Sequence, residues 1–292
     1  MRPGQWHLTE DLDGFLDQAG DFLQSRPVLH TIPLTVTESL RKRGVAAYGA
    51  EAPILGWLER GGEVRAALFR TPPRRLVLTP LTTEEADALA AHLAGLDYLL
   101  PGVNADHDTA TAFAEAWQRH VDATPLLHER QRLYRLGALT SPEPLPDGQG
   151  RVAGEPDREQ LMCWYHEFVD SIGGVASSDA SSWADTRIAH GRIRLWQTPD
   201  GTPVSMAGAT PMVAGQIRVA PVYTPAHLRR RGYAGAATVD VSRAALAAGA
   251  AEVLLFADLA NPTSNGLYQR IGYRPVTDFA LYDFSYGGPE AG

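Results

Sequence analysis

The segment that decides the fold covers residues 217–273 and reads IRVAPVYTPAHLRRRGYAGAATVDVSRAALAAGAAEVLLFADLANPTSNGLYQRIGY. A short apolar run from Ile217 to Val222 predicts a strand, and Pro225 ends it. After an arginine-rich turn, apolar residues recur at helical spacing until Gly249, which is typical of a C-terminal helix cap. Residues 252–259 predict a second strand. The segment therefore predicts a strand, a tight turn, a helix and another strand.

The turn before the helix reads Arg229-Arg230-Arg231-Gly232-Tyr233-Ala234. The first backbone N–H groups of a helix have no partner inside the helix, and the helix dipole favours negative charge there. Gly232 and Ala234 are small, so a phosphate can approach the backbone. The arginines add positive charge around it. We therefore expect a turn that binds a pyrophosphate.

The spacing of this turn separates several phosphate-binding motifs. It does not fit the G-x-x-x-x-G-K-[ST] loop of nucleoside triphosphatases, nor the G-x-G-x-x-G turn of dinucleotide-binding proteins. It fits [QR]-x-x-G-x-[GA], filled by Arg229, Gly232 and Ala234. A second block, N-P-T-S-N-G-L-Y from Asn261 to Tyr268, follows the second strand and leads to I-G-Y at residues 271–273. Together the two blocks resemble the coenzyme A-binding core of the GNAT acetyltransferase superfamily.

This resemblance implies a cofactor site between two strands that splay apart. The backbone of Val222 and Thr224 would bond the pantetheine arm, and the N–H groups of residues 230–235 would hold the pyrophosphate. Asn261 would bond the cofactor arm, and Asn265 would lie against it. The residues expected to bind acetyl-CoA are Val222, Tyr223, Thr224, Arg229, Arg230, Arg231, Gly232, Tyr233, Ala234, Gly235, Asn261 and Asn265.

The resemblance also implies the chemistry of an N-acetyltransferase. The acetyl group of acetyl-CoA would pass to a primary amine of a small-molecule acceptor by direct attack in a ternary complex. Tyr268 would be the catalytic residue, as the general acid that protonates the departing thiolate. Backbone N–H groups near Val222 would polarise the thioester carbonyl.

The general base and the acceptor pocket are less specified by the sequence. Each candidate base is a carboxylate that equally fits a helix cap or a solvated surface position, and the candidates are Glu167, Asp179, Asp185 and Asp258. We expect the pocket near residues 156–190, where Trp164, Tyr165 and Trp183 are candidates for its lining. Two alternatives stay open, namely an acyltransferase that resembles mycothiol synthase, and a binding protein that senses acyl-CoA without turnover.

The rest of the chain predicts a second copy of the same arrangement. A length of 292 residues, at about 150 residues per domain, predicts two domains. Residues 141–150 are rich in proline and glycine and read as a linker between domains at residues 1–140 and 151–292. In the first half, Thr79-Pro80-Leu81-Thr82 replaces the cofactor turn. The first half therefore reads as a degenerate GNAT-like domain, with an unrelated α/β domain as the alternative.

The fold class expected is mixed α/β, with two GNAT-like domains that each contain a mixed, mostly antiparallel sheet flanked by helices. The first half predicts helices at residues 8–25, 83–96 and 108–121, a helical or mixed segment at 30–44, and strands at 47–59, 63–69, 74–78, 98–103 and 126–139. The second half predicts a helix from Pro156 that Gly173-Gly174 ends, a helix at 177–190, strands at 151–153, 192–198, 203–213 and 215–222, and a last strand at 279–284.

Composition limits the function classes. The net charge of -8 argues against a nucleic-acid binder, which would carry a basic surface. Cys163 is the only cysteine and reads as a small core residue, and the nine histidines lack metal-ligand spacing, so neither a disulfide nor a metal site is expected. No apolar run has the length of a signal peptide or membrane span, so we expect a cytoplasmic monomer or homodimer without membrane partners.

Overall fold

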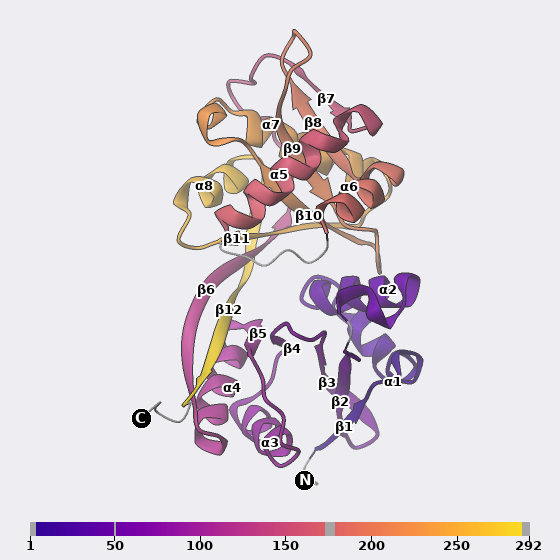
Figure 1. Ribbon diagram of the computed structural model, residues 1–292, viewed down its shortest axis with the longest axis vertical. Helices are drawn as coiled ribbons and strands as arrows, with labels where there is room; N and C mark the ends of the chain where they lie inside the picture. Colours follow the sequence, from indigo (N-terminus) through magenta and orange to yellow (C-terminus); the bar gives the residue numbers. More distant parts are fainter. Residues whose placement is uncertain (1–3, 50, 173–178, 288–292) are drawn as a thin grey trace. The chain divides into compact units, whose positions relative to one another are not determined.

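The computed structural model describes residues 4–49, 51–172 and 179–287, and two halves of the chain repeat one order of elements. That order is a strand, two helices, three strands, a helix, a strand, a helix and a strand (Figure 1). The first half contains β1 (Gln5–Thr9), α1 (Leu12–Ser25), α2 (Thr31–Arg43), β2 (Ile54–Arg60), β3 (Glu63–Arg70), β4 (Leu76–Leu78), α3 (Thr83–Ala94), β5 (Gly102–Asp106), α4 (His107–His120) and β6 (Ala123–Leu136). The second contains β7 (Gln149–Val152), α5 (Arg158–Ser171), α6 (Ala180–Ala189), β8 (Ile193–Gln197), β9 (Pro203–Ala209), β10 (Gln216–Tyr223), α7 (Tyr233–Ala247), β11 (Glu252–Asp258), α8 (Pro262–Arg270) and β12 (Tyr273–Tyr286).

The two halves also pair their strands in the same way. Strands β1 to β4 pair antiparallel in sequence, and β4 and β5 pair parallel. Strands β7 to β10 repeat this antiparallel series, and β10 and β11 pair parallel. The predicted fold class, a mixed and mostly antiparallel sheet with flanking helices in each half, is confirmed.

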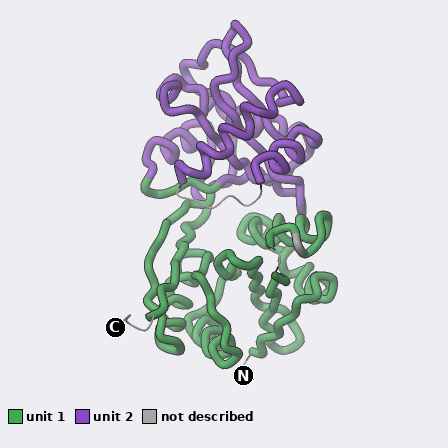
Figure 2. Tube along the Cα trace, viewed as in Figure 1, with its two compact units in different colours: residues 1–133, 256–260, 276–292 green, residues 134–255, 261–275 purple. Residues whose placement is uncertain are grey.

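The last strand of each half is exchanged with the other half. The hydrogen-bonded order is β1-β2-β3-β4-β5-β12-β6-β11-β10-β9-β8-β7, so β12 follows β5 and β6 follows β11. Phe279 of β12 is opposite Asp106 of β5. The chain forms two compact units, residues 1–133, 256–260 and 276–292, and residues 134–255 and 261–275 (Figure 2). These units are not the linear domains expected from the sequence, whose boundaries stay a prediction.

In the first unit, α3 and α4 cover one face of the sheet. Their buried residues Leu89, Phe113 and Trp117 form one apolar cluster with strand residues such as Leu68 and Val103. Helices α1 and α2 pack on the opposite face, because strand side chains alternate between the two faces.

In the second unit, α5 and α6 pack on one face of the sheet. Trp164 of α5 and Trp183 of α6 belong to a cluster with Leu195 of β8. Helix α7 packs on the opposite face, where Arg194, the neighbour of Leu195 in β8, pairs with Asp240 of α7.

Several boundaries differ from those that the sequence predicts. Helix α1 begins at Leu12 rather than at residue 8, because the side chain of Asp11 caps it and accepts the N–H of Asp13 at 3.1 Å. Residues 5–9, which precede it, form β1 and place Trp6 opposite Leu58. The N-terminal part of the expected helix is therefore a strand.

The strand predicted at residues 98–103 is β5, which covers Gly102–Asp106, because the residues of the neighbouring strands that pair with it fix its position there. Val103 is opposite Leu76, the first residue of β4, and Gly102 is opposite Asp283 of β12. Strand β12 starts at Tyr273 rather than at residue 279, since exchange gives its whole length a place in the sheet. The predicted helix end at Gly173-Gly174 and the first residues of the expected helix 177–190 lie outside the described residues.

Candidate cofactor and catalytic site

The predicted cofactor strand separates from its parallel neighbour. Among the described residues, β10 pairs with β11 over Gln216 to Arg218, and the remainder of β10 pairs only with β9, through Val219, Val222 and Tyr223. A change of register lies between Val219 and Val222. In open α/β sheets, a crevice at the carboxyl ends of diverging strands is the usual place for a ligand.

The carboxyl end of β10 is held by a small polar network. The hydroxyl of Ser205 in β9 donates to the carbonyl oxygen of Tyr223 at 3.0 Å and lies 2.8 Å from the hydroxyl of Thr224. The Nε of Arg229 donates to the carbonyl oxygen of Thr224 at 3.0 Å. These contacts fix the backbone of two expected cofactor residues and tie the first arginine of the motif back to the strand.

The turn that follows has the backbone form that a phosphate-binding turn needs. Arg230 and Gly232 have φ angles of 65° and 84°, in the left-handed region that favours glycine. Gly232 is the N-cap of α7, no side chain caps this helix, and no acidic residue lies in its first turn. The first intrahelical bond runs from the N–H of Ala236 to the carbonyl of Gly232 at 3.1 Å, so the N–H groups before Ala236 lack helical acceptors.

The corresponding turn in the first half is closed and acidic. The hydroxyl of Thr82 accepts the N–H of Glu85, and the Glu85 carboxylate accepts the N–H of Thr82, in a complete capping box at the start of α3. Glu84 and Glu85 place negative charge in the first turn. An anion would meet satisfied donors and repulsion here.

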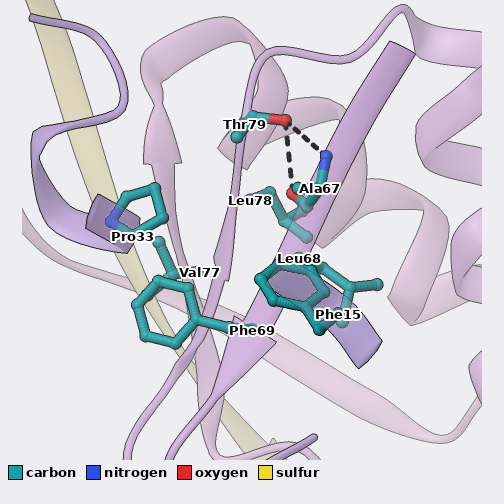
Figure 3. Close-up of a pocket in the computed structure, with 8 residues that line it drawn as sticks. All are labelled: Phe15, Pro33, Ala67, Leu68, Phe69, Val77, Leu78 and Thr79. Atoms are coloured by element: carbon teal, nitrogen blue, oxygen red, sulfur yellow. Dashed lines mark hydrogen bonds between the residues drawn. The ribbon is translucent and has the colours of Figure 1, made fainter. Parts of the chain in front are cut away.

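The strand end before that turn is also occupied by internal contacts. The Thr79 hydroxyl accepts the N–H of Ala67 at 2.8 Å and lies 3.2 Å from the Ala67 carbonyl (Figure 3). Beside it is a small apolar pocket that has no room for a water molecule. Its lining residues are Phe15, Pro33, Ala67, Leu68, Phe69, Val77, Leu78 and Thr79. This place has the same position in the fold as the end of β10, without its donors or positive charge.

The two sequence motifs come together at the start of α7. A side-chain carbon added at Gly235 would lie 2.9 Å from Cδ1 of Leu267, the residue before Tyr268 in α8. The same carbon would lie 3.6 Å from Pro142, and one added at Gly232 would lie 3.4 Å from Pro146. The expected linker therefore borders the cofactor turn on one side, and α8 borders it on another.

Helix α8 is fixed by its asparagines. The side chain of Asn261 caps the helix by accepting the N–H of Ser264 at 3.0 Å. The Nδ2 group of Asn265 donates to the Asn261 carbonyl at 2.8 Å, and its Oδ1 accepts the hydroxyl of Tyr134 at 2.8 Å. Both asparagines thus shape the helix, whereas their expected contacts with the cofactor stay predictions. The sequence gives no signal for the role of Tyr134, because its partner is 131 positions away.

Tyr268, the expected general acid, lies in α8. Its side chain is buried with 8% of the residue exposed. Burial raises the pKa of Tyr268 to about 12, above the value of about 10 that is ordinary for tyrosine.

One of the four candidate bases faces the cofactor strand. The hydroxyl of Tyr223 donates to Oε2 of Glu167 in α5 at 2.7 Å. Burial, together with this hydrogen bond and the negative charge of Glu167, raises the pKa of Tyr223 to about 12. The sequence indicates Tyr223 only as a cofactor residue, because its contact with Glu167 joins positions that are 56 residues apart.

The other three carboxylates have structural partners. Asp179 caps α6 by accepting the N–H groups of Ser181 and Ser182. Asp185 pairs with Arg158 at 2.6 Å, and Asp258 accepts the N–H of Ala260 at 2.8 Å. Structure therefore distinguishes Glu167 from residues that look equivalent in the sequence.

The aromatic residues expected around an acceptor pocket belong to the core of the second unit. Trp164, Tyr165 and Trp183 are each at most 8% exposed. The rings of Tyr165 and Trp183 stack with centroids 4.5 Å apart. Cys163 is exposed rather than a core residue, because its position on α5 faces away from this cluster, and its Sγ lies 3.7 Å from the Glu167 carboxylate.

Neither a metal cluster nor a membrane-spanning helix occurs among the described residues. No group of three or more histidine, cysteine or acidic side chains in the described ranges has the arrangement of a metal site. In the same ranges, none of the helices combines the length and apolar character that a membrane span requires.

Solved structures share this fold over both halves of the chain. A GNAT-family acetyltransferase from Colwellia psychrerythraea matches with a TM-score of 0.62 and 10% identity, over 96% of this chain and 100% of that chain. A GCN5-related N-acetyltransferase from Sphaerobacter thermophilus matches with a TM-score of 0.59 and 16% identity, over 91% and 95%. A tandem GNAT protein from the clavulanic acid biosynthesis pathway matches with a TM-score of 0.55 and 13% identity, over 98% and 100%.

These likenesses, at such low identity, concern the fold. No protein-family model matches the sequence, and no curated protein matches it either. The GNAT resemblance that the two motifs suggest is confirmed as a fold, and the match to a tandem GNAT protein extends it to the first half.

Proposed function

We propose that this chain is an acetyl-CoA-dependent N-acetyltransferase whose acceptor is the primary amine of a small molecule. The observation that supports it most is the start of α7, where uncapped N–H groups follow the left-handed Gly232 beside three arginines. This arrangement fits a diphosphate, since it offers backbone donors, a favourable dipole and positive charge without a competing carboxylate. In the first half, the corresponding turn is occupied by a capping box and carries two carboxylates.

The residues proposed to hold the cofactor are those at the splayed strand end and the turn. Backbone groups of Val222 and Thr224 would pair with the pantetheine amides, and the N–H groups of residues 233–235 would bind the diphosphate. Arg230 and Arg231, both exposed, would add charge at its edge. Acetyl-CoA, when bound, supplies the acetyl group that the amine receives.

Two residues are proposed to move protons. Glu167 would accept a proton from the acceptor ammonium, because its carboxylate lies at the end of β10 and already receives one hydrogen bond from Tyr223. Tyr268 would give a proton to the departing sulfur, because a tyrosine hydroxyl carries its proton at neutral pH and this one belongs to the second sequence motif.

The test begins with calorimetric binding of acetyl-CoA to the whole chain. Thiol release is then followed with a panel of small amines, amino acids, aminoglycosides and a cysteinyl sugar. We expect binding and turnover on one class of amine, and a response to the cysteinyl sugar alone would favour the chemistry of mycothiol synthase. Binding without turnover on any amine would favour an acyl-CoA sensor, and no binding would refute the cofactor site.

Two substitutions test the assigned residues once a substrate is known. Tyr268→Phe is expected to lower turnover and leave the Kd for acetyl-CoA unchanged, and Glu167→Gln is expected to lower turnover because an amide cannot accept the ammonium proton. Tyr286→Phe is the matched control, since this hydroxyl bonds the Leu100 carbonyl at 2.7 Å in the first unit. Turnover at the wild-type rate in Tyr268→Phe would exclude the general-acid role.

A further inference from the structure

Tyr134 lies in β6, the last strand of the first half of the sequence, and both it and its contacts in α8 belong to the second compact unit. Its side chain is fully buried, with 0% of the residue exposed. The hydroxyl donates to Oδ1 of Asn265 at 2.8 Å and lies 3.1 Å from Nε2 of Gln269, which donates to it. Because Asn265 and Gln269 are one helical turn apart, this single hydroxyl joins two turns of α8.

The same tyrosine also packs against the proposed catalytic side chain. The rings of Tyr134 and Tyr268 have centroids 6.5 Å apart at an angle of 56°. The ring of Tyr273 also packs against that of Tyr268, with centroids 6.1 Å apart and the ring planes at 66°. Both arrangements are tilted or edge-on, as aromatic pairs prefer. The direction of the Tyr268 hydroxyl therefore depends on how these rings and α8 are held.

The position of Tyr268 in α8 links the two kinds of contact. Asn265, Tyr268 and Gln269 are spaced three and four residues apart, so they share one side of the helix. A rotation or shift of α8 that moved the Tyr268 hydroxyl would break the hydrogen bonds of Tyr134. Conversely, if those bonds are lost, the hydrogen bond of the Asn261 cap still holds the N-terminal end of α8. Gln269 lies at the opposite end of the helix.

We propose that Tyr134 is a positioning residue for Tyr268, an inference that rests on the proposed acetyl transfer. The first half of the chain has a capped and acidic turn where the second half has its cofactor turn. Through β6 it nevertheless supplies a side chain that orients the transfer site. The site is therefore incomplete without residues that precede the linker.

The test uses Tyr134→Phe in the full chain, which keeps the ring and removes both hydrogen bonds. We expect kcat to fall by about two- to tenfold, the range that a neutral hydrogen bond supports. The KM for the amine and the Kd for acetyl-CoA are expected to stay within about twofold of the wild type, since Tyr134 bonds Asn265 of α8, whereas the proposed pantetheine and diphosphate donors lie at the end of β10 and the start of α7. Tyr286→Phe removes a half-buried hydroxyl that bonds Leu100 and Trp117 in the first unit, and it is expected to keep the wild-type kcat.

A double-mutant cycle distinguishes positioning from a general loss of stability. In the Tyr268→Phe background, the Tyr134 change is expected to have no further effect on kcat, because its effect passes through the Tyr268 hydroxyl. Equal fold-changes in both backgrounds would overturn the proposal, and so would an unchanged kcat in Tyr134→Phe. Should that variant fail to fold, Gln269→Ala removes one of the bonds from an exposed residue, and a wild-type kcat there would overturn it too.

The failure of the proposed function would have a different signature. If the single variant Tyr268→Phe turns over at the wild-type rate, Tyr268 is not the general acid, regardless of the effect of Tyr134→Phe. If Tyr268→Phe slows turnover and Tyr134→Phe does not, the proposed function stands and only the positioning role is wrong.

Discussion

Replacement of Gly232 by alanine separates the role of this residue in folding from its role in the cofactor turn. Gly232 has φ 84° at the N-cap of α7, and Gly249 has φ 88° just after the same helix. A residue other than glycine costs about 1–2 kcal/mol in this left-handed region. Neither site adds a serious clash, since the nearest atom to the new carbon is Pro146 Cδ at 3.4 Å for Gly232 and nothing lies within 4 Å for Gly249.

The two variants should therefore lose similar stability and differ in binding. Gly232→Ala and Gly249→Ala are each expected to lower the free energy of unfolding by about 1–2 kcal/mol. Only the first places a methyl group beside the uncapped N–H groups of α7. The loss of a hydrogen bond to a charged group is about 1.5–3 kcal/mol, which weakens the Kd for acetyl-CoA by about 10- to 150-fold.

The assay combines urea unfolding without ligand and calorimetric titration with acetyl-CoA. The expected result is equal destabilisation in both variants and weakened binding in Gly232→Ala alone. Binding at the wild-type Kd in Gly232→Ala would refute the assignment of the turn to a diphosphate. Equal weakening in Gly249→Ala would show that strain in α7, rather than access to its N-terminus, controls affinity.

Three other predictions concern stability and are measured by urea or thermal unfolding. Thr82→Ala removes the capping box with Glu85 and is expected to lower the free energy of unfolding by about 1 kcal/mol without changing the Kd for acetyl-CoA. A changed Kd would mean that the turn of the first half takes part in the cofactor site. The hydrogen bond from Arg151 holds the pKa of Asp157 below its usual value, so the pair stabilises the fold above about pH 4, and this stabilisation is lost as pH falls through the lowered pKa. Asp157→Asn should reduce the drop in unfolding free energy at acid pH, and an unchanged drop would exclude this pair as its cause. Phe113→Ala empties a position with 0% exposure and is expected to cost about 3–5 kcal/mol, whereas a loss under about 1 kcal/mol would contradict its place in the core.

The local parts of the fold could be predicted from the sequence because their causes are local. The capping box of Thr82, the helix after Gly232 and the hairpin of β2 and β3 each depend on residues a few positions apart. Strand β1 was missed, since Trp6 and Leu8 continue the apolar pattern of the following helix and only the cap at Asp11 separates the two. A cap is a weaker signal than periodicity, so the predicted helix began too early.

The candidate site, too, is predictable from the sequence only where its causes are local. The turn at Gly232 and the block around Tyr268 follow from motif spacing, and the structure brings them together through Gly235 and Leu267. Glu167 could not be distinguished from the other carboxylates, because only the folded chain shows that it faces Tyr223. Nor does a local pattern reveal a contact that depends on strand exchange.

That exchange also sets the order in which the chain can finish folding during its synthesis. Residue 106 leaves the ribosome long before residue 279, yet the two are opposite each other in neighbouring strands β5 and β12. Until β12 emerges, the edge of β5 has no partner on that side, and an unpaired edge invites association with other chains. Every molecule of this protein therefore passes through a stage in which nearly all of its residues have been made and the sheet of its first half is still open.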